Sequence, residues 1–404
     1  MDAILIGENI ARLRKMQGLT QQELAERLNV SNKAVSKWEN GQGYPDIEHF
    51  PVLANLFGVS VDYLMNGQKK GITVAGNMLV DVVKNIESFP KPGMLAYISE
   101  SSRAVGGCVP NVAIDLAKID RSLPVYASGR LGNDENGRYV LSQLQINGVN
   151  TDRVVLDAKE PTGYSDVMSV PSGERTFFHQ KGANINFVPG DVQVKSLECD
   201  IFHIGYILLL DAMDAENEKY GTVMAGLLKD VQSRGIKTSV DVVSSNEGGY
   251  AEKIIPALKH CNYLIINEIE CCAIFDIPAY DESGNLDKSA VKLAMQKCAE
   301  HGVSDKVIVH CKEIGFALDV KSGRFTQMPS LEIPKEEIKG SVGAGDAYCA
   351  GCLYGLYNGY TDEEILEFAA SAAACNLFAA NSVDGMKPKT EIDKISKKYG
   401  RKKV

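Results

Sequence analysis

A short polar stretch bracketed by glycines, residues 66–71, divides this 404-residue sequence into two parts with different patterns. Before it, helical and capping signals are dense, and there is no good strand pattern. After it, apolar runs alternate with amphipathic segments, as in chains where strands alternate with helices. We therefore expect an all-α domain over 1–66, a linker over 67–71 and an α/β domain over 72–404.

The charge balance limits the partners that the whole molecule can bind. The chain has 43 Lys and Arg against 52 Asp and Glu, a formal charge of −9 at pH 7, which argues against a nucleic-acid coat or a membrane-surface protein. Residues 1–70 contain equal numbers of basic and acidic side chains, so the negative excess lies beyond them.

The cysteines and the apolar runs indicate the compartment. Ten cysteines in so long a chain are not a disulfide framework, no signal peptide precedes them, and the longest strongly apolar run, 206–210, is far too short to span a bilayer. We expect a cytoplasmic protein with reduced thiols and no membrane partner. Cys349 and Cys352 lack a second pair, so we expect two small buried hydrophobic side chains rather than a zinc site.

The smaller part carries the signals of short helices joined by a tight turn. Residues 8–17 have helical apolar spacing and end at Gly18, and Thr20 and Glu23 form a capping box that starts a second helix. Residues 29–31 make a three-residue turn into a third helix. Two short helices joined in this way predict a helix-turn-helix, whose second helix can lie in a DNA major groove.

The exposed side chains of the third helix suit DNA. The positions at its start and on its outer face are Asn32, Lys33, Ser36 and Lys37. Asparagine and lysine suit adenine and guanine edges, and Gln21, at the start of the preceding helix, is placed to bond a phosphate. The alternative is a domain used for protein contact, which the zero net charge favours because counterion release is then weak.

Three segments of this part, 19–25, 38–41 and 56–64, resemble the Cro/phage-repressor (XRE-type) DNA-binding domain. The resemblance covers nearly all of 1–66 and implies double-stranded DNA as a partner. We expect binding as a homodimer, because two half-sites supply the affinity that one neutral copy lacks.

The most informative segment of the larger part is a glycine-rich turn that leads into a run of small and apolar residues. The backbone amides of Gly343, Ala344 and Gly345 would face an anion together at the start of a helix. Asp346 then lies beside that anion and can take a proton from an attacking hydroxyl. The alternative for this one motif is an aspartate that caps a helix.

Five motifs resemble, in order, those of the ribokinase/PfkB family of sugar and nucleoside kinases: 76–81, 105–111, 129–137, 267–270 and 340–346. The resemblance covers 72–404 and implies phosphorylation of a sugar or polyol hydroxyl with ATP and Mg²⁺. The fold that it implies is a doubly wound, mostly parallel sheet with a small β lid, built from residues 94–105 and 162–180, that often serves as a dimer surface.

The resemblance assigns roles to residues outside the turn. The implied substrate residues are Asp81, Gly106, Gly107, Asn111 and, on the lid, Arg175. The implied nucleotide-side residues are Asn267, Glu270 and Ser341, with Glu270 holding Mg²⁺ through water. Each has a structural alternative: a capped helix for Asp81, a helix cap for Asn111, a strand end for Glu270 and a solvated side chain for Arg175.

The nucleotide side departs from the family pattern. His310 and Lys312 stand where the family has the threonine and glycine of its Thr-x-Gly, and 340–341 are Gly-Ser instead of Asp-Thr. ATP as the donor is thereby left open, and Lys312 is equally compatible with a phosphate contact or a solvated position. His179, near the end of the lid, is a further candidate for substrate contact.

Two functions from different classes follow. The first is a small-molecule kinase joined to a repressor-type DNA-binding domain. The alternative is a sugar-sensing transcriptional regulator whose kinase-like domain is weak or inactive. The substrate, be it a sugar, a phosphosugar or a nucleoside, is not identified by the sequence.

Overall fold

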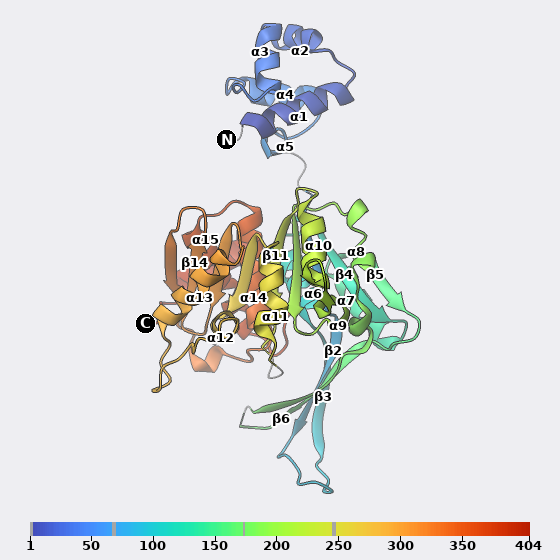
Figure 1. Ribbon diagram of the computed structural model, residues 1–404, viewed down its shortest axis with the longest axis vertical. Coiled ribbons are helices and arrows are strands. Elements are labelled where there is room, and N and C mark those ends of the chain that lie inside the picture. The colour runs from blue at the N-terminus through green and yellow to red at the C-terminus, as the bar shows by residue number, and fades with distance from the viewer. Residues whose placement is uncertain (1–2, 67–69, 173, 245–247) are drawn as a thin grey trace. The chain divides into compact units, whose positions relative to one another are not determined.

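The computed structural model describes residues 3–66, 70–172, 174–244 and 248–404, and the chain separates into two compact units, 1–70 and 71–404 (Figure 1). Residues 67–69 of the predicted linker lie outside the described residues, as does the side chain of Arg175. Among the described residues, no helix has the length and apolar character needed to cross a bilayer.

The described part of the N-terminal unit contains five helices: α1 (Ala3–Met16), α2 (Gln21–Leu28), α3 (Asn32–Glu39), α4 (His49–Phe57) and α5 (Val61–Asn66). Thr20 and Glu23 form the predicted capping box, and Asn29 ends α2 in the left-handed conformation, with φ 55°. The predicted helix at 8–17 begins five residues earlier and ends at Met16. The all-α character of this unit is thus confirmed.

A buried ion pair joins three helices of this unit. Arg14, which is 8% exposed, donates from Nε to Glu39 Oε1 at 2.6 Å and from Nη2 to Oε2 at 2.9 Å. Gln21 Nε2 also donates to Glu39 Oε2, at 2.7 Å. Because these bonds link α1, α2 and α3, they fix the orientation of α3 relative to the other two helices.

The C-terminal unit is built on a nine-stranded sheet in the order β15-β14-β13-β12-β11-β8-β1-β4-β5 (Figure 1). The strands are β1 (Ile72–Ala75), β4 (Val125–Gly132), β5 (Asn150–Asp157), β8 (Ile201–Ile207), β11 (Lys237–Val242), β12 (Tyr263–Asn267), β13 (Lys306–His310), β14 (Ile314–Asp319) and β15 (Phe325–Pro329). β14 runs antiparallel to both neighbours, and the other pairs are parallel. The predicted mostly parallel sheet is confirmed.

Helices cover both faces of this sheet. One hydrophobic cluster includes α6 (Cys108–Ile119), α14 (Ala344–Tyr357), α15 (Asp362–Leu377) and part of α16 (Lys389–Lys398). The other includes α10 (Val223–Gln232), α11 (Tyr250–Leu258), α12 (Glu268–Ala273) and α13 (Lys288–Glu300). Ile265 belongs to the first cluster and its neighbours Leu264 and Ile266 to the second, because successive side chains of a strand point to opposite faces.

The unit also contains α7 (Glu135–Ile146) and several short elements: α8 (Pro189–Val192), α9 (Asp211–Asp214), β9 (Glu216–Asn217) and β10 (Gly221–Thr222). Thr222 caps α10 by accepting from the amide of Ala225, and β9 and β10 pair ahead of it.

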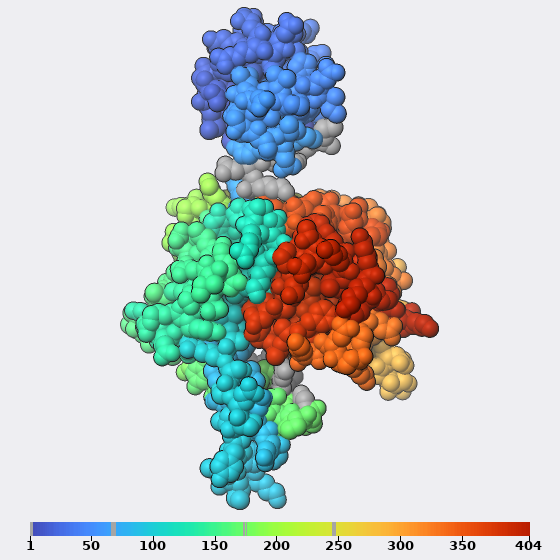
Figure 2. Space-filling model, turned by 180° about the vertical axis from the view of Figure 1, so that it is seen from behind, coloured from blue at the N-terminus to red at the C-terminus, as the bar shows by residue number. Residues whose placement is uncertain are grey.

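A second, four-stranded sheet forms the lid, in the order β3-β2-β6-β7, and it extends away from the main body (Figures 1 and 2). Its strands are β2 (Leu79–Ile86), β3 (Ile98–Gly106), β6 (Gly163–Ser169) and β7 (Arg175–Gln180). The lid is confirmed, but the sequence analysis left out β2. That strand pairs with β3 and β6 along its whole length and carries Asp81, so the alternative of a capped helix at Asp81 is wrong.

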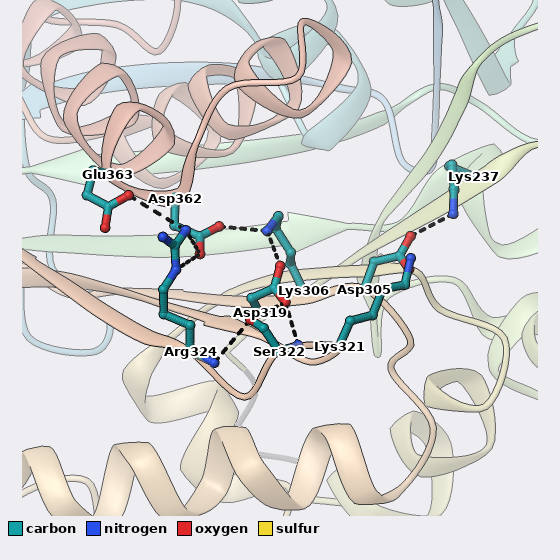
Figure 3. Close-up of polar contacts among 9 residues, drawn as sticks. All are labelled: Lys237, Asp305, Lys306, Asp319, Lys321, Ser322, Arg324, Asp362 and Glu363. Carbon is teal, nitrogen blue, oxygen red and sulfur yellow. Dashed lines mark hydrogen bonds and ion pairs between the residues drawn. The ribbon is translucent and has the colours of Figure 1, made fainter. Parts of the chain in front are cut away.

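An ion-pair network joins the antiparallel edge of the main sheet to α15 (Figure 3). Asp362, whose side chain is fully buried, binds Lys306 Nζ at 2.6 Å and Arg324 Nη2 at 2.8 Å. Lys306 also binds Asp319 at 2.7 Å. Because Asp362 begins α15, its charge is stabilised by the helix N-terminus as well as by the two cations.

Candidate active site

The glycine-rich turn lies at the N-terminus of α14. Gly343 caps the helix with φ 77°, and a Cβ there would lie 2.6 Å from Ser382 Cβ, so both the backbone angle and the space require glycine. The amide of Ala344 already donates to the Ser341 carbonyl oxygen at 3.3 Å. The predicted anion contact therefore rests more on the neighbouring amides of Gly343 and Gly345.

Asp346 lies in the first turn of α14 and is 5% exposed. Asn111 Nδ2 donates to its Oδ2 at 2.8 Å, and the Tyr206 hydroxyl lies 2.9 Å from Oδ1 and 3.0 Å from Oδ2. Burial raises the pKa of Asp346 to about 6, against the lowering effect of these two hydrogen bonds. A carboxylate with such a pKa is ionised at neutral pH and remains basic enough to accept a proton.

Two partners of this carboxylate system were missed by the sequence analysis. Tyr206, the last residue but one of β8, has a left-handed backbone, φ 64°, and it lies in none of the five motifs. Ser382 Oγ donates to Asn111 Oδ1 at 2.7 Å, and this bond fixes the amide so that its NH₂ group faces Asp346. The predicted Asn111 is therefore placed beside the predicted base.

Asp81 is half-buried on β2, where burial raises its pKa to about 6 and a hydrogen bond from Ser165 opposes the shift. A Cβ on Gly106 would lie 2.3 Å from Asp81 Oδ2. Gly107, with φ 89°, would place a Cβ 2.8 Å from the Asn77 carbonyl oxygen. The two glycines thus allow the close approach of three backbone segments around Asp81.

His179 lies on β7, across from Ser165. Its Nδ1 is 3.0 Å from Ser165 Oγ, and burial lowers its pKa. Ser165 therefore contacts both Asp81, a predicted substrate residue, and His179, a further candidate for substrate contact.

Asn267 and Glu270 form a capping box at the start of α12. Asn267 Oδ1 accepts from the Glu270 amide at 2.8 Å, and Glu270 Oε2 accepts from the Asn267 amide at 3.0 Å. Ser244 Oγ donates to Glu270 Oε1 at 2.8 Å. Burial raises the pKa of Glu270 to about 7. This all-oxygen donor set fits Mg²⁺, and because both carboxylate oxygens are already hydrogen-bonded, binding through water suits it best.

A cavity of about 570 Å³ lies beside the turn. Its lining includes Ser341, Ala344 and Gly345 of the turn, and the apolar side chains of Leu331, Ile338 and Leu377. It also includes His310 and Lys312, which replace the threonine and glycine of the family's Thr-x-Gly. The ring of His310 lies 4.8 Å from that of Tyr348, and burial lowers the pKa of His310 to about 4. The imidazole of His310 is therefore neutral at pH 7, and it contributes no positive charge to the wall of this cavity.

The C-terminal segment also reaches this cavity. Arg401 forms a β-bridge with Leu331, and Lys402 Nζ donates to the Lys312 carbonyl oxygen at 2.7 Å. No sequence signal other than their charge marks this packing.

In the N-terminal unit, α3 presents the predicted DNA-contacting residues in two ways. Asn32, Lys33 and Lys37 are exposed, whereas Ser36 is half-buried and its Oγ accepts from Asn40 Nδ2 at 3.4 Å. The side-chain amide of Gln21 is already bonded to Glu39. A phosphate contact by Gln21 therefore needs its second N–H or its backbone amide.

Comparison with known proteins gives a match for each unit. Residues 69–389 match the model of the pfkB family carbohydrate kinase, and residues 10–64 match a helix-turn-helix model. A ribokinase of Arabidopsis thaliana is 27% identical over 330 residues, 81% of this chain and 81% of the relative. The HTH-type transcriptional activator BcrR of Enterococcus faecalis is 44% identical over 62 residues, 15% of this chain and 30% of the activator.

A solved structure gives the same fold. The structure of Arabidopsis thaliana ribokinase complexed with ribose and ATP has a TM-score of 0.67 and 23% sequence identity, and the match covers 81% of this chain and 99% of that chain. At this identity the similarity shows the fold alone.

Proposed function

The chain belongs to the pfkB family of carbohydrate kinases, and from this premise we propose that it transfers the γ-phosphoryl group of ATP to a hydroxyl of a sugar or related polyol. We propose further that the N-terminal unit binds double-stranded DNA. The observation that carries the first proposal is the position of Asp346, a buried, hydrogen-bonded carboxylate in the first turn of a helix that begins at a glycine turn.

The chemistry needs little more than this arrangement. The proton of the sugar hydroxyl goes to Asp346, the hydroxyl oxygen bonds to the γ-phosphorus, and the bond from that phosphorus to the β–γ bridging oxygen breaks to leave ADP. The amides of Gly343 and Gly345 and the N-terminus of α14 stabilise the charge on the transferring group. Asn111 and Tyr206 hold the carboxylate in position.

The substrate hydroxyls are assigned to the lid side of the site. Asp81 supplies an acceptor for adjacent hydroxyls, and Gly106 and Gly107 allow close approach of the sugar. Arg175 remains a proposed substrate contact. Because a relative named ribokinase covers most of both chains, pentoses are the first substrates to test, with phosphosugars and nucleosides next.

The cavity beside the turn is the proposed site of the nucleotide. Its apolar wall suits a purine base, and Ser341 lies at the end that meets the turn. Asn267 and Glu270 would hold Mg²⁺ through its water molecules, and the ion supplies neutralisation of the charge on the donor phosphates.

For the DNA unit we propose a homodimer whose two α3 helices read neighbouring half-sites about 34 Å apart. Asn32, Lys33 and Lys37 make the groove contacts, with Ser36 and Gln21 near the phosphates. Substrate binding to the kinase unit would then alter operator affinity through the dimer. The zero charge of the unit makes dimerisation a requirement.

An assay of ADP release against a panel of pentoses, hexoses, phosphosugars and nucleosides tests the kinase proposal. Turnover with one class, and retention of DNA binding by the same preparation, supports it. The rival function, a sugar sensor without useful turnover, draws on His310 and Lys312 replacing the family's Thr-x-Gly. Sugar-dependent DNA binding without turnover on any member of the panel would favour that rival.

A further inference from the structure

A group of sulfur, nitrogen and oxygen donors is buried directly behind the candidate active site. His203, Asp241 and Cys349 each bring one such atom, and these atoms all lie within 4.8 Å of one another. His203 comes from β8, Asp241 from the neighbouring strand β11, and Cys349 from α14, three residues after Asp346. None of the three belongs to the phosphoryl-transfer machinery described above.

The register of the sheet explains why these side chains meet. His203 pairs with Ser239 between β8 and β11, so Asp241, two residues further on, points to the same face as both. That face packs against α14, which carries Cys349. Gly205 completes the arrangement, because a Cβ there would lie 2.0 Å from Cys108 Sγ.

The distances agree with those around a tetrahedral metal. Cys349 Sγ and Cys108 Sγ each lie 3.7 Å from His203 Nε2. On a tetrahedral zinc ion, with Zn–S about 2.3 Å and Zn–N about 2.0 Å, sulfur and nitrogen ligands are about 3.5 Å apart. The Asp241 oxygen lies within 4.8 Å of the His203 and Cys349 ligand atoms, so it must move closer to join them.

The histidine is already oriented for ligation. Its Nδ1 lies 3.0 Å from Ser239 Oγ, which is the kind of outer contact that fixes a metal-binding imidazole. With Nδ1–H donating to the serine, the lone pair of Nε2 faces the two sulfur atoms. Burial lowers the pKa of His203 to about 3, so the ring is neutral, as a ligand must be.

We propose that His203, Cys349 and Asp241 form a binding site for a thiophilic divalent cation such as Zn²⁺, with Cys108 as the fourth ligand. This proposal replaces, for Cys349, the expectation of a purely hydrophobic role. Sulfur and imidazole ligands select such an ion over Mg²⁺, which prefers oxygen. Binding forms the metal–sulfur bonds as the two bound thiols release their protons to solvent, and Asp241 ligates as the carboxylate after its own proton has left. With two thiolates and one carboxylate around a divalent cation, the occupied site carries one net negative charge and lies next to Asp346.

Titration of the full-length, metal-free protein with Co²⁺ alone tests the proposal without any kinase assay. We expect a sulfur-to-cobalt charge-transfer band and the d–d bands of tetrahedral Co²⁺, both displaced by Zn²⁺. The Cys349→Ser variant loses the charge-transfer intensity from this ligand, and Ser239→Ala weakens Zn²⁺ binding roughly 10- to 100-fold. Cys352→Ser is the matched control, because Cys352 is a buried cysteine of the same helix.

Absence of a charge-transfer band in the wild-type protein would overturn the proposal, as would a band of equal intensity in Cys349→Ser. If Cys349→Ser is poorly folded by circular dichroism, His203→Gln replaces it, and a Co²⁺ spectrum unchanged in that variant has the same meaning. Because the readout is spectroscopic, its result is independent of whether the kinase proposal holds.

Discussion

The Tyr206 hydroxyl lies within 3.0 Å of both carboxylate oxygens of Asp346, although the two residues are 140 positions apart in the sequence. The hydroxyl stabilises the charged form of the carboxylate and leaves the pKa lower than burial alone would set it. Tyr206 therefore acts as a positioning residue for the base.

Tyr206→Phe tests this relationship. Without the hydroxyl, the pKa of Asp346 rises, so the ascending limb of the pH profile of kcat moves to higher pH. We expect kcat at pH 7 to fall roughly tenfold, the cost of about one hydrogen bond to a charged group, with little change in the KM for ATP. A lower kcat without movement of the acid limb would contradict the proposed role.

Gly106→Ala tests the contact between the lid and Asp81. The added Cβ would lie 2.3 Å from Asp81 Oδ2, so the carboxylate must move away from the substrate. We expect the KM for the sugar to rise at least roughly tenfold, which is about 1.4 kcal/mol, while the KM for ATP stays unchanged. Gly190→Ala is the control, because a Cβ there meets nothing within 4 Å.

Asp81→Asn tests the electrostatic cost of burying the Asp81 carboxylate. The folded-state pKa of Asp81, about 6, is above its unfolded value of about 3.9, so the folded state binds the proton more tightly. Its contribution is close to neutral below pH 4 and becomes unfavourable as the pH rises to 6, reaching on the order of 3 kcal/mol at pH 7. The variant removes that penalty.

Urea denaturation at two pH values measures this difference. We expect Asp81→Asn to be more stable than wild type at pH 7 and equally stable at pH 4. A variant that is less stable than wild type at pH 7 would show that the charged form of Asp81 is favoured in the folded protein, contrary to the prediction.

The recognition helix is tested by the double variant Asn32→Ala, Lys33→Ala. Both side chains are exposed at the start of α3, and each base contact is worth about 1–3 kcal/mol. We expect operator affinity on the protein's own upstream DNA to fall at least tenfold, and the salt dependence to weaken by about one charge. Lys15→Ala, on the exposed side of α1, serves as the control, and equal losses for both variants would refute the assignment.

Contiguous motifs made part of the site predictable. Residues 343–346 form a turn and a helix start by local rules alone, and Asn267 and Glu270 form a capping box for the same reason. The alternation of strands and helices likewise predicted the layered sheet. These features are determined by residues close together in the sequence, because glycines, capping side chains and apolar spacing act on the local backbone.

Contacts between distant segments were not predictable in the same way. Ser382 and Tyr206 contact Asn111 and Asp346 only because the sheet register and the α14 packing bring them together. The strand β2 was missed although most of its residues are apolar, because what makes it part of the lid is its pairing with β3 and β6, and that pairing is non-local. The meeting of His203 with Cys349 has the same origin.

Phosphoryl transfer by wild-type protein and by Asp346→Asn, on the sugar that the substrate panel identifies, tests the central claim most directly. Asparagine keeps the shape of the side chain but cannot accept the proton, so we expect kcat to fall by roughly 100- to 10,000-fold with both KM values little changed. Asp230→Asn, an exposed aspartate of α10, should retain the wild-type rate. A turnover number for Asp346→Asn equal to that of wild type would contradict the account.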